Sequence, residues 1–247
     1  MADDNSVEVP LKVKTSDLPA RTLSAVVMLA LFAGALWLGG WWWDLFVLLI
    51  AGGVLWEFRR LVTAFAPSLV ARTNWILGGI IYIAVAAAML MFLRERNGLV
   101  SVLIVVLMVI ATDVGAFFTG RTFGGPKIAP KISPSKTWAG LFGGMIAASA
   151  LLAGYLVYGL HHLGSPSYED VSDWSGALLG IAIGSVTAIV AQMGDFFESW
   201  MKRRAGVKDS SHLIPGHGGL FDRVDGLLGV SFVLGVLFIF GRLVEIA

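Results

Sequence analysis

The chain has 247 residues, of which 57% are hydrophobic and only 14% charged, and its mean hydropathy is +0.80. Soluble domains carry about 25% charged residues, so this composition excludes an ordinary soluble protein. The formal net charge is +1 with no basic stripe, which gives no sign of a nucleic-acid partner. Cysteine is absent, which excludes disulfides, thiolate metal sites and a cysteine nucleophile.

Long apolar stretches follow a polar beginning. Residues 1–21 are mixed in charge, and we expect a cytoplasmic tail there rather than a signal peptide. A helix needs about 20 apolar residues to cross a bilayer. Such stretches lie at residues 22–40, 41–57, 75–93, 98–119, 138–160, 176–194 and 226–245. The sequence therefore predicts an all-α, polytopic integral membrane helix bundle of about seven transmembrane helices, forming a single domain over residues 22–247.

The first two stretches are nearly continuous. We expect them to be separate helices joined by a tight hairpin at Gly39-Gly40, with the tryptophans of residues 41–43 at the membrane interface. Asp44 and Glu57 shorten the apolar length of the second stretch. Whether residues 41–57 cross the membrane completely is therefore left open.

Lysine and arginine predict the orientation, because they concentrate in cytoplasmic loops. The segments that hold nearly all of them are residues 1–21, 58–74, 120–137 and 195–225. The opposite loops hold Arg94 and Arg96, and residues 161–175 contain acidic residues but no lysine or arginine. We therefore expect a cytoplasmic N-terminus, with the loops 120–137 and 195–225 on the cytoplasmic face.

Two polar features precede the last spans. Asp113 interrupts an apolar stretch, and a carboxylate there needs a partner, a metal or water; a structural hydrogen bond to a neighbouring helix is the alternative. Residues 127–137 combine lysines, serines and prolines, with Thr137 placed to cap the following helix. The lysines suit phosphate oxygens, although an ordinary positively charged loop has the same composition.

Residues 194–225 hold the densest polar cluster. If residues 195–204 are helical, Asp195, Glu198, Ser199 and Lys202 share one face, and Gly206 ends the helix. A Pro-Gly-His-Gly-Gly loop follows at residues 215–219, whose backbone N–H groups can approach an anion closely. Two aspartates three positions apart then begin the last span.

Carboxylates alternating with bases suit magnesium-assisted phosphate chemistry. Mg²⁺ prefers oxygen ligands and bridges to substrate phosphates, while cations and backbone amides neutralise charge on phosphoryl oxygens. A merely solvated helix face is the alternative, and the glycine-rich alternation of acids and bases disfavours it.

These residues resemble the signature of the phosphatidate cytidylyltransferase family. The matching elements, with their spacing intact, are Ser199, Lys202-Arg203, Lys208-Asp209, Pro215-Gly216-His217-Gly218-Gly219 and Asp222-Arg223-Val224-Asp225. The segments around Asp113 and around residues 132–138 are also similar to the family. The resemblance covers roughly residues 110–226 by motif and the N-terminal half only by its spans.

The resemblance implies a CTP:phosphatidate cytidylyltransferase of phospholipid biosynthesis, in the bacterial inner (cytoplasmic) membrane with its active site facing the cytoplasm. Such an enzyme transfers CMP from CTP to phosphatidic acid, giving CDP-diacylglycerol and pyrophosphate. The implied cofactor is Mg²⁺, with a second cation left open, and a homodimer is also left open. Residues 22–247 would then be one transmembrane catalytic domain.

By the same resemblance, the expected catalytic residues are Asp195, Ser199, Lys202, Asp222 and Asp225, and the expected metal ligands are Asp195, Asp222 and Asp225. The expected substrate-binding residues are Asp113, Lys136, Arg203, Lys208, His217, Gly218, Gly219 and Arg223. For His217, a purely structural role is as well supported as substrate binding. We expect the lipid to enter sideways, near Lys136 and Asp113.

Three other functions compete. A CTP-dependent polyprenol or phytol kinase would release CDP instead of pyrophosphate. A CDP-alcohol phosphotransferase needs an acidic motif beginning Asp-Gly with a different spacing, which the sequence lacks. A transporter would place its charges in mid-span, whereas here the acids gather at span ends and in one loop.

Overall fold

The computed structural model describes residues 18–162 and 172–246 and is built almost entirely of helices. They are α1 (Leu18–Leu38), α2 (Gly40–Phe65), α3 (Leu69–Asn97), α4 (Leu99–Phe123), α5 (Trp138–His162), α6 (Asp173–Arg204) and α7 (Phe221–Ile246). The all-α prediction is confirmed. Most of the expected tail 1–21 and of the loop 161–175 lies outside the described residues.

Six of the helices in the described part are long and apolar enough to cross a membrane. The helix that is missing from this group is α2, which is 26 residues long but carries Asp44, Glu57, Arg59 and Arg60. The acidic residues that made this span doubtful in the sequence therefore keep it outside the group in the structure as well.

The expected hairpin between the first two helices is present. Gly39 and Gly40 have φ angles of +64° and +51°, a region that glycine enters without steric cost. Trp41 and Trp42 are exposed, whereas Trp43 is buried and donates from Nε1 to Leu90 O at 3.2 Å. The turn thus leaves two tryptophans for the interface and uses the third for packing.

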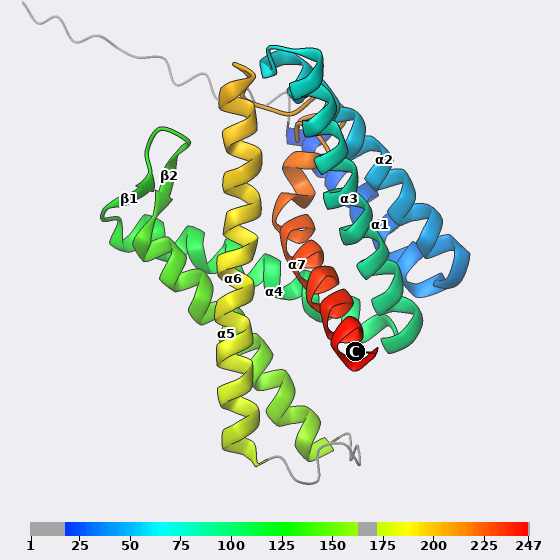
Figure 1. Cartoon of the computed structure of the whole chain (residues 1–247). Coiled ribbons are helices and arrows are strands. Elements are labelled where there is room, and N and C mark those ends of the chain that lie inside the picture. The colour runs from blue at the N-terminus through cyan, green and yellow to red at the C-terminus, as the bar shows by residue number, and fades with distance from the viewer. Residues whose placement is uncertain (1–17, 163–171, 247) are drawn as a thin grey trace, which may run out of the picture.

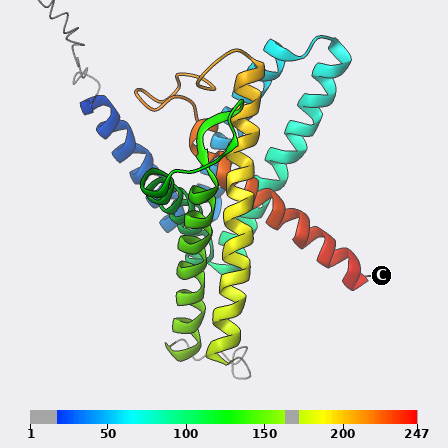
Figure 2. The same ribbon diagram turned by 90° about the vertical axis from the view of Figure 1, so that its left-hand side faces the viewer.

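Helix α6 runs between two groups of helices (Figure 1). On one side α2, α3 and α7 enclose a core that includes Phe58, Val62, Ile83, Met201 and Phe221. In this view α4 and α5 cross α6, and the small hairpin that joins them lies on the other side. Figure 2 shows α5 alongside α6, whereas α1 and the last part of α7 are strongly inclined to it.

Small residues bring α4, α5 and α6 into close contact. A Cβ added to Gly180 or Gly184 would overlap the α5 backbone, and one at Gly115 would overlap Gly143 of α5. Ser149 Oγ adds contacts to α6, at 3.0 Å from Ile181 O. Close backbone approach of this kind is how helices associate where lipid removes the hydrophobic driving force. The glycine-rich stretch 140–154 is therefore used for packing inside this chain.

The segment between α4 and α5 contains a hairpin that the sequence did not predict. Strands β1 (Lys127–Ala129) and β2 (Ser133–Thr137) pair antiparallel, with Lys127 opposite Thr137. As expected, Thr137 then caps α5, because its Oγ1 accepts from Gly140 N at 3.0 Å.

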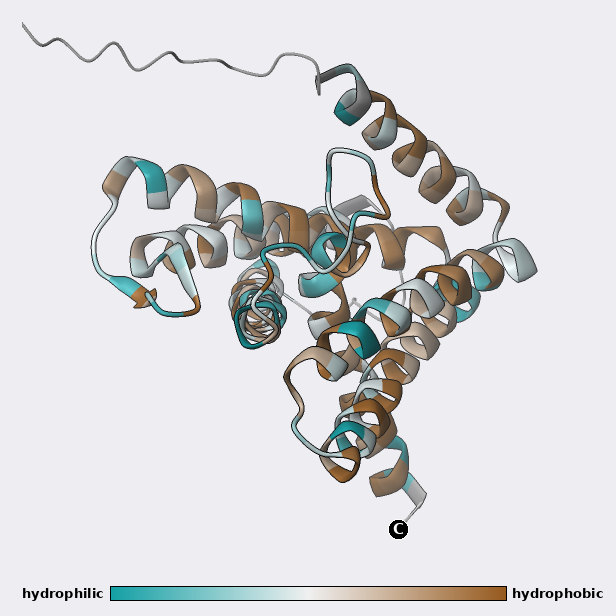
Figure 3. Cartoon of the chain, turned by 90° about the horizontal axis from the view of Figure 1, so that it is seen from above, coloured by the Kyte–Doolittle hydropathy of each residue, from teal (hydrophilic) through white to brown (hydrophobic). Residues whose placement is uncertain are grey.

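Hydrophobic side chains cover the outside of the bundle. Figure 3 shows brown along most of the helical ribbon, and Trp37, Leu69 and Phe240 are more than half exposed. In contrast, Glu57 and Glu198 are fully buried. This inversion fits a protein whose surroundings are apolar, and it concentrates the polar chemistry inside and at one end.

Candidate active site

The last turns of α6 carry the first part of the site. Residues 195–204 are helical as predicted, α6 ends at Arg204, and Gly206 with a φ of +71° follows its C-cap Ala205. Val207 N donates to Lys202 O at 3.0 Å, which satisfies a carbonyl of the last turn. On the predicted shared face, Ser199 Oγ donates to Asp195 Oδ1 at 3.3 Å.

Lys202 lies between two buried carboxylates. Its Nζ forms an ion pair with Glu198, one turn earlier, and lies 2.6 Å from Asp222 Oδ1 of α7. The side chains of Glu198 and Asp222 are 1% and 5% exposed, so neither charge is solvated. Removing Lys202 would leave two uncompensated buried charges, which is strongly destabilising. Lys202 therefore joins α6 to α7.

Asp222 also holds the loop that precedes it. Its Oδ2 accepts from Ser210 N at 2.9 Å, from Ser210 Oγ at 2.8 Å and from Gly219 N at 2.8 Å. A Cβ added to Gly219 would overlap Ser210 Oγ and the carboxylate of Glu57. Gly219 is thus required for close packing. The sequence predicted Asp222 as a metal ligand. In the structure both of its carboxylate oxygens already have partners within the protein.

Glu57 of α2 is the second anchor of the same loop, and it was not among the predicted site residues. Its carboxylate accepts from Ser210 Oγ at 3.0 Å, from Ser211 Oγ, from Leu220 N at 2.9 Å and from Phe221 N at 2.6 Å. The sequence did contain a signal for Glu57, because an acidic residue within an apolar stretch is a candidate functional residue. Its partners lie more than 150 positions away, so the sequence could not name them.

The glycine-rich loop folds into a tight turn. Ile214 N donates to Gly218 O at 2.9 Å, and His217 N donates to Ile214 O at 3.0 Å. Gly216 and Gly218 have φ angles of +75° and +85°, which other residues adopt only with strain. The two glycines therefore permit a turn that the preceding anchors hold in place.

A cavity of about 530 Å³ lies over this turn. We call it the anion pocket, because its charged and titratable lining side chains are mostly basic: Arg21, Lys208, His212, His217 and Arg223, with Asp209 as the acidic exception. Backbone of residues 214–218 completes the wall. The structure thus brings together the predicted residues Lys208, His217, Gly218 and Arg223, in a setting suited to several phosphate groups.

Helix α1 contributes to the anion pocket, which the sequence did not predict. Ser24 Oγ lies 2.8 Å from His217 Nδ1 and 3.0 Å from Pro215 O. Arg21, one turn earlier, lines the cavity and packs against Gly216, where an added Cβ would meet its Cγ. No local motif marks these two residues, since their role depends on how α1 meets a loop near the other end of the chain.

A second group of predicted residues forms what we call the carboxylate cluster: Asp113 of α4, Asp195 of α6, Asp225 of α7 and Lys136 of β2. Lys136 forms an ion pair with Asp195. Asp113 and Asp225 lie close enough to interact electrostatically with both of these residues. The structure therefore brings three carboxyl groups and one ammonium together from four different elements.

Arg203 is placed differently from the other predicted cations. Its Nε donates to Ile132 O at 3.2 Å, in the turn of the β hairpin. It does not line the anion pocket. Its expected role in substrate binding stays a prediction, and the contact observed here fixes the hairpin against α6.

The carboxylate cluster fits a hard divalent cation in its donor chemistry. Among the described residues no three acidic, histidine or cysteine side chains converge as a complete metal site. Mg²⁺ does not need such a cage, because it usually takes one or two carboxylates together with waters and substrate phosphates. Asp225 accepts a single backbone hydrogen bond and Asp195 is ion-paired with Lys136, whereas Asp222 would have to give up the Lys202 ion pair and three hydrogen bonds to bind a metal.

Comparison of the sequence with those of known proteins shows which family the chain belongs to. The sequence pattern that defines the cytidylyltransferase family matches residues 68–243. A protein of Brucella suis named phosphatidate cytidylyltransferase is 38% identical over 213 residues, which cover 83% of this chain and 73% of the relative. A protein of the same name from Rickettsia conorii is 32% identical over 227 residues, covering 91% and 93%. The chain therefore belongs to the cytidylyltransferase family, and the resemblance found in its motifs is confirmed.

Proposed function

We propose that this protein transfers CMP from CTP to phosphatidic acid, forming CDP-diacylglycerol and pyrophosphate. The observation that carries the proposal is the position of the basic anion pocket beside the carboxylate cluster, joined by the first turn of α7. That single turn presents Arg223 to the pocket, Asp222 to Lys202 and Asp225 to the cluster. The names of the relatives supply the substrate class.

The reaction needs positioning rather than a covalent intermediate. An oxygen of the lipid phosphate attacks the α-phosphorus of CTP, a new P–O bond forms, and the bond from that phosphorus to the β-phosphate oxygen breaks. Pyrophosphate leaves with the electron pair. Arg21, Lys208 and Arg223 hold the β- and γ-phosphates and neutralise charge on the leaving group, and the backbone N–H groups of the turn assist them.

The proposed cofactor is Mg²⁺ held by Asp195 and Asp225. When bound, it supplies charge neutralisation between the reacting phosphates. Lys136 orients Asp195 and balances part of the negative charge of the cluster, while Asp113 adds to the attraction for a cation. Ser199 fixes the other oxygen of Asp195. The loop before α7 and the ends of α2, α6 and α7 are held together by Glu57, Lys202 and Asp222.

The proposed setting is the cytoplasmic face of a bacterial inner membrane. The beginning of α1 and the loop between α6 and α7 lie at one end of the bundle, and the C-terminal end of α7 lies at the other (Figure 1). The basic segments of the sequence mark the first end as cytoplasmic. CTP would reach the anion pocket from water, and the lipid would approach from the membrane.

A labelled-substrate assay tests the proposal. Purified protein in lipid nanodiscs receives phosphatidic acid and CTP labelled on either the α- or the γ-phosphate, with and without Mg²⁺. The expected result is α-label in the lipid, γ-label in pyrophosphate, and no reaction without the metal. Transfer of γ-label to lipid with release of CDP would establish a lipid kinase instead, and transfer of neither label would reject the enzyme assignment.

A further inference from the structure

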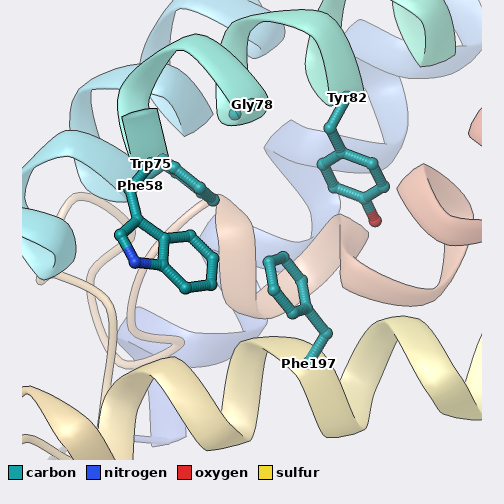
Figure 4. A pocket seen from close by; sticks show the side chains of 6 residues that line it. Phe58, Trp75, Gly78, Tyr82 and Phe197 are labelled. Atoms are coloured by element: carbon teal, nitrogen blue, oxygen red, sulfur yellow. The ribbon is translucent and has the colours of Figure 1, made fainter. Parts of the chain in front are cut away.

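A second cavity lies between α2, α3 and α6. It has a volume of about 360 Å³ and is partly open to the surface of the bundle. Its lining is Phe58, Trp75, Gly78, Gly79, Tyr82 and Phe197, which gives almost entirely apolar walls. Figure 4 shows the aromatic side chains gathered around this space.

Aromatic contacts join the walls of the cavity, and Gly78 lies at its exposed edge. The ring of Phe197 lies 6.4 Å from that of Phe58 and 5.9 Å from that of Tyr82, so three helices support one another through aromatic contacts. Gly78 is exposed, and a Cβ added there would meet no atom within 4 Å. From Trp75 to Tyr82 the cavity follows α3 for ~10 Å at 1.5 Å per residue.

The inner end of the cavity meets the polar site. Tyr82 extends from α3 with its hydroxyl oxygen toward α7 (Figure 4), and it is close enough to Asp225 to interact electrostatically. Phe197 directly precedes the buried Glu198, and Phe58 directly follows the buried Glu57. The same turns of α2 and α6 therefore present apolar rings to the cavity and carboxylates to the site.

We propose that this cavity holds one acyl chain of the lipid substrate while the lipid phosphate lies at the carboxylate cluster. The inference rests on the proposed function for the identity of the headgroup. An apolar slot with a single polar group at its inner end matches a lipid that has one phosphate and long chains. The chain enters past Gly78, and Tyr82 lies where the chain gives way to the polar headgroup.

Filling the mouth tests the proposal in the reaction. Gly78→Leu places a side chain in the cavity where there is room for it, and Gly52→Leu is the matched control, since Gly52 is also exposed on a helix with no atom near an added Cβ. With long-chain (dioleoyl) phosphatidic acid, Gly78→Leu should raise the lipid KM about tenfold, equivalent to ~1.4 kcal/mol. The KM for CTP, the KM for short-chain (dihexanoyl) lipid and the control should be unchanged.

A binding measurement separates this proposal from the reaction itself. Nanodiscs containing phosphatidic acid with brominated chains should quench the fluorescence of Trp75 more than discs containing phosphatidylcholine with the same chains. The part due to Trp75 is the difference between the wild-type protein and Trp75→Phe. Selective quenching supports the chain site even if no pyrophosphate is formed. Equal quenching by the two lipids, or an unchanged long-chain KM in Gly78→Leu, would overturn it.

Discussion

Ser24 and His217 are 193 positions apart in the sequence, yet Ser24 Oγ lies 2.8 Å from His217 Nδ1. The same hydroxyl lies 3.0 Å from both Arg21 O and Pro215 O, which can only accept. The arrangement that uses every partner has Ser24 donating to a carbonyl and His217 donating from Nδ1 to Ser24. Ser24 therefore fixes the orientation of the His217 ring in the wall of the anion pocket.

Removing this contact should weaken nucleotide binding. Ser24→Ala deletes the group that orients His217, and a neutral hydrogen bond contributes ~1 kcal/mol, so the KM for CTP should rise about fivefold while kcat changes little. Ser24→Thr should restore binding. Ser101→Ala is the control, because the exposed Ser101 hydroxyl donates to the nearby carbonyl of Asn97, at the end of α3. An equal rise in both alanine variants would contradict this role of Ser24.

The two arginines that flank the loop should differ in their effect on CTP. Arg223 lines the anion pocket, whereas Arg203 donates to Ile132 of the hairpin. Since a charged hydrogen bond contributes ~2 kcal/mol, Arg223→Ala should raise the KM for CTP about thirtyfold. Arg203→Ala should leave this KM close to the wild-type value. Steady-state kinetics at saturating lipid measures both, and the reverse ranking would mean that the pocket lies elsewhere.

The carboxylate cluster should govern the response to magnesium. Asp225→Asn and Asp195→Asn keep the size of the side chain but remove a charge. Each should lower the affinity for activating Mg²⁺ by about a hundredfold, because a carboxylate proposed to hold the ion is lost. Asp44→Asn at the opposite end of the bundle serves as the control. The measurement is activity against Mg²⁺ concentration, and unshifted curves for both cluster variants would remove the metal from this position.

Glu57 should matter for stability more than any exposed acid. Glu57→Ala leaves the buried Ser211 hydroxyl and two backbone N–H groups without their acceptor, while Ser210 keeps Asp222 as its acceptor. The loss should cost ~3 kcal/mol or more in the free energy of unfolding. Thermal unfolding in detergent measures the effect. Glu95→Ala, at an exposed position of α3, provides the comparison and should unfold like the wild type.

Features set by neighbouring residues could be predicted from the sequence. The break at Gly39, the end of α6 just before Gly206 and the cap of α5 by Thr137 all depend on residues within one turn, and each is present. The spans themselves follow from apolar length alone. The shared face of Asp195 and Ser199 likewise follows from helical spacing.

Features that join distant segments could not be predicted. Nothing near Arg21 or Ser24 shows that α1 meets the loop before α7, and nothing near Glu57 names Ser210 as its partner. The β hairpin was missed because its strands are short and held by neighbours such as Arg203. Such contacts arise only after the helices have packed.

The pairing of Glu57 with Ser210 also has a consequence for biogenesis. Glu57 leaves the ribosome with the first hairpin, whereas its hydrogen-bond donors are synthesised more than 150 residues later. During this interval Glu57 lacks the hydrogen-bond donors that it has in the folded protein. Because a carboxylate in the membrane is costly, water or the insertion machinery must solvate it. The start of α7 ends that interval, because Leu220 N and Phe221 N donate to Glu57.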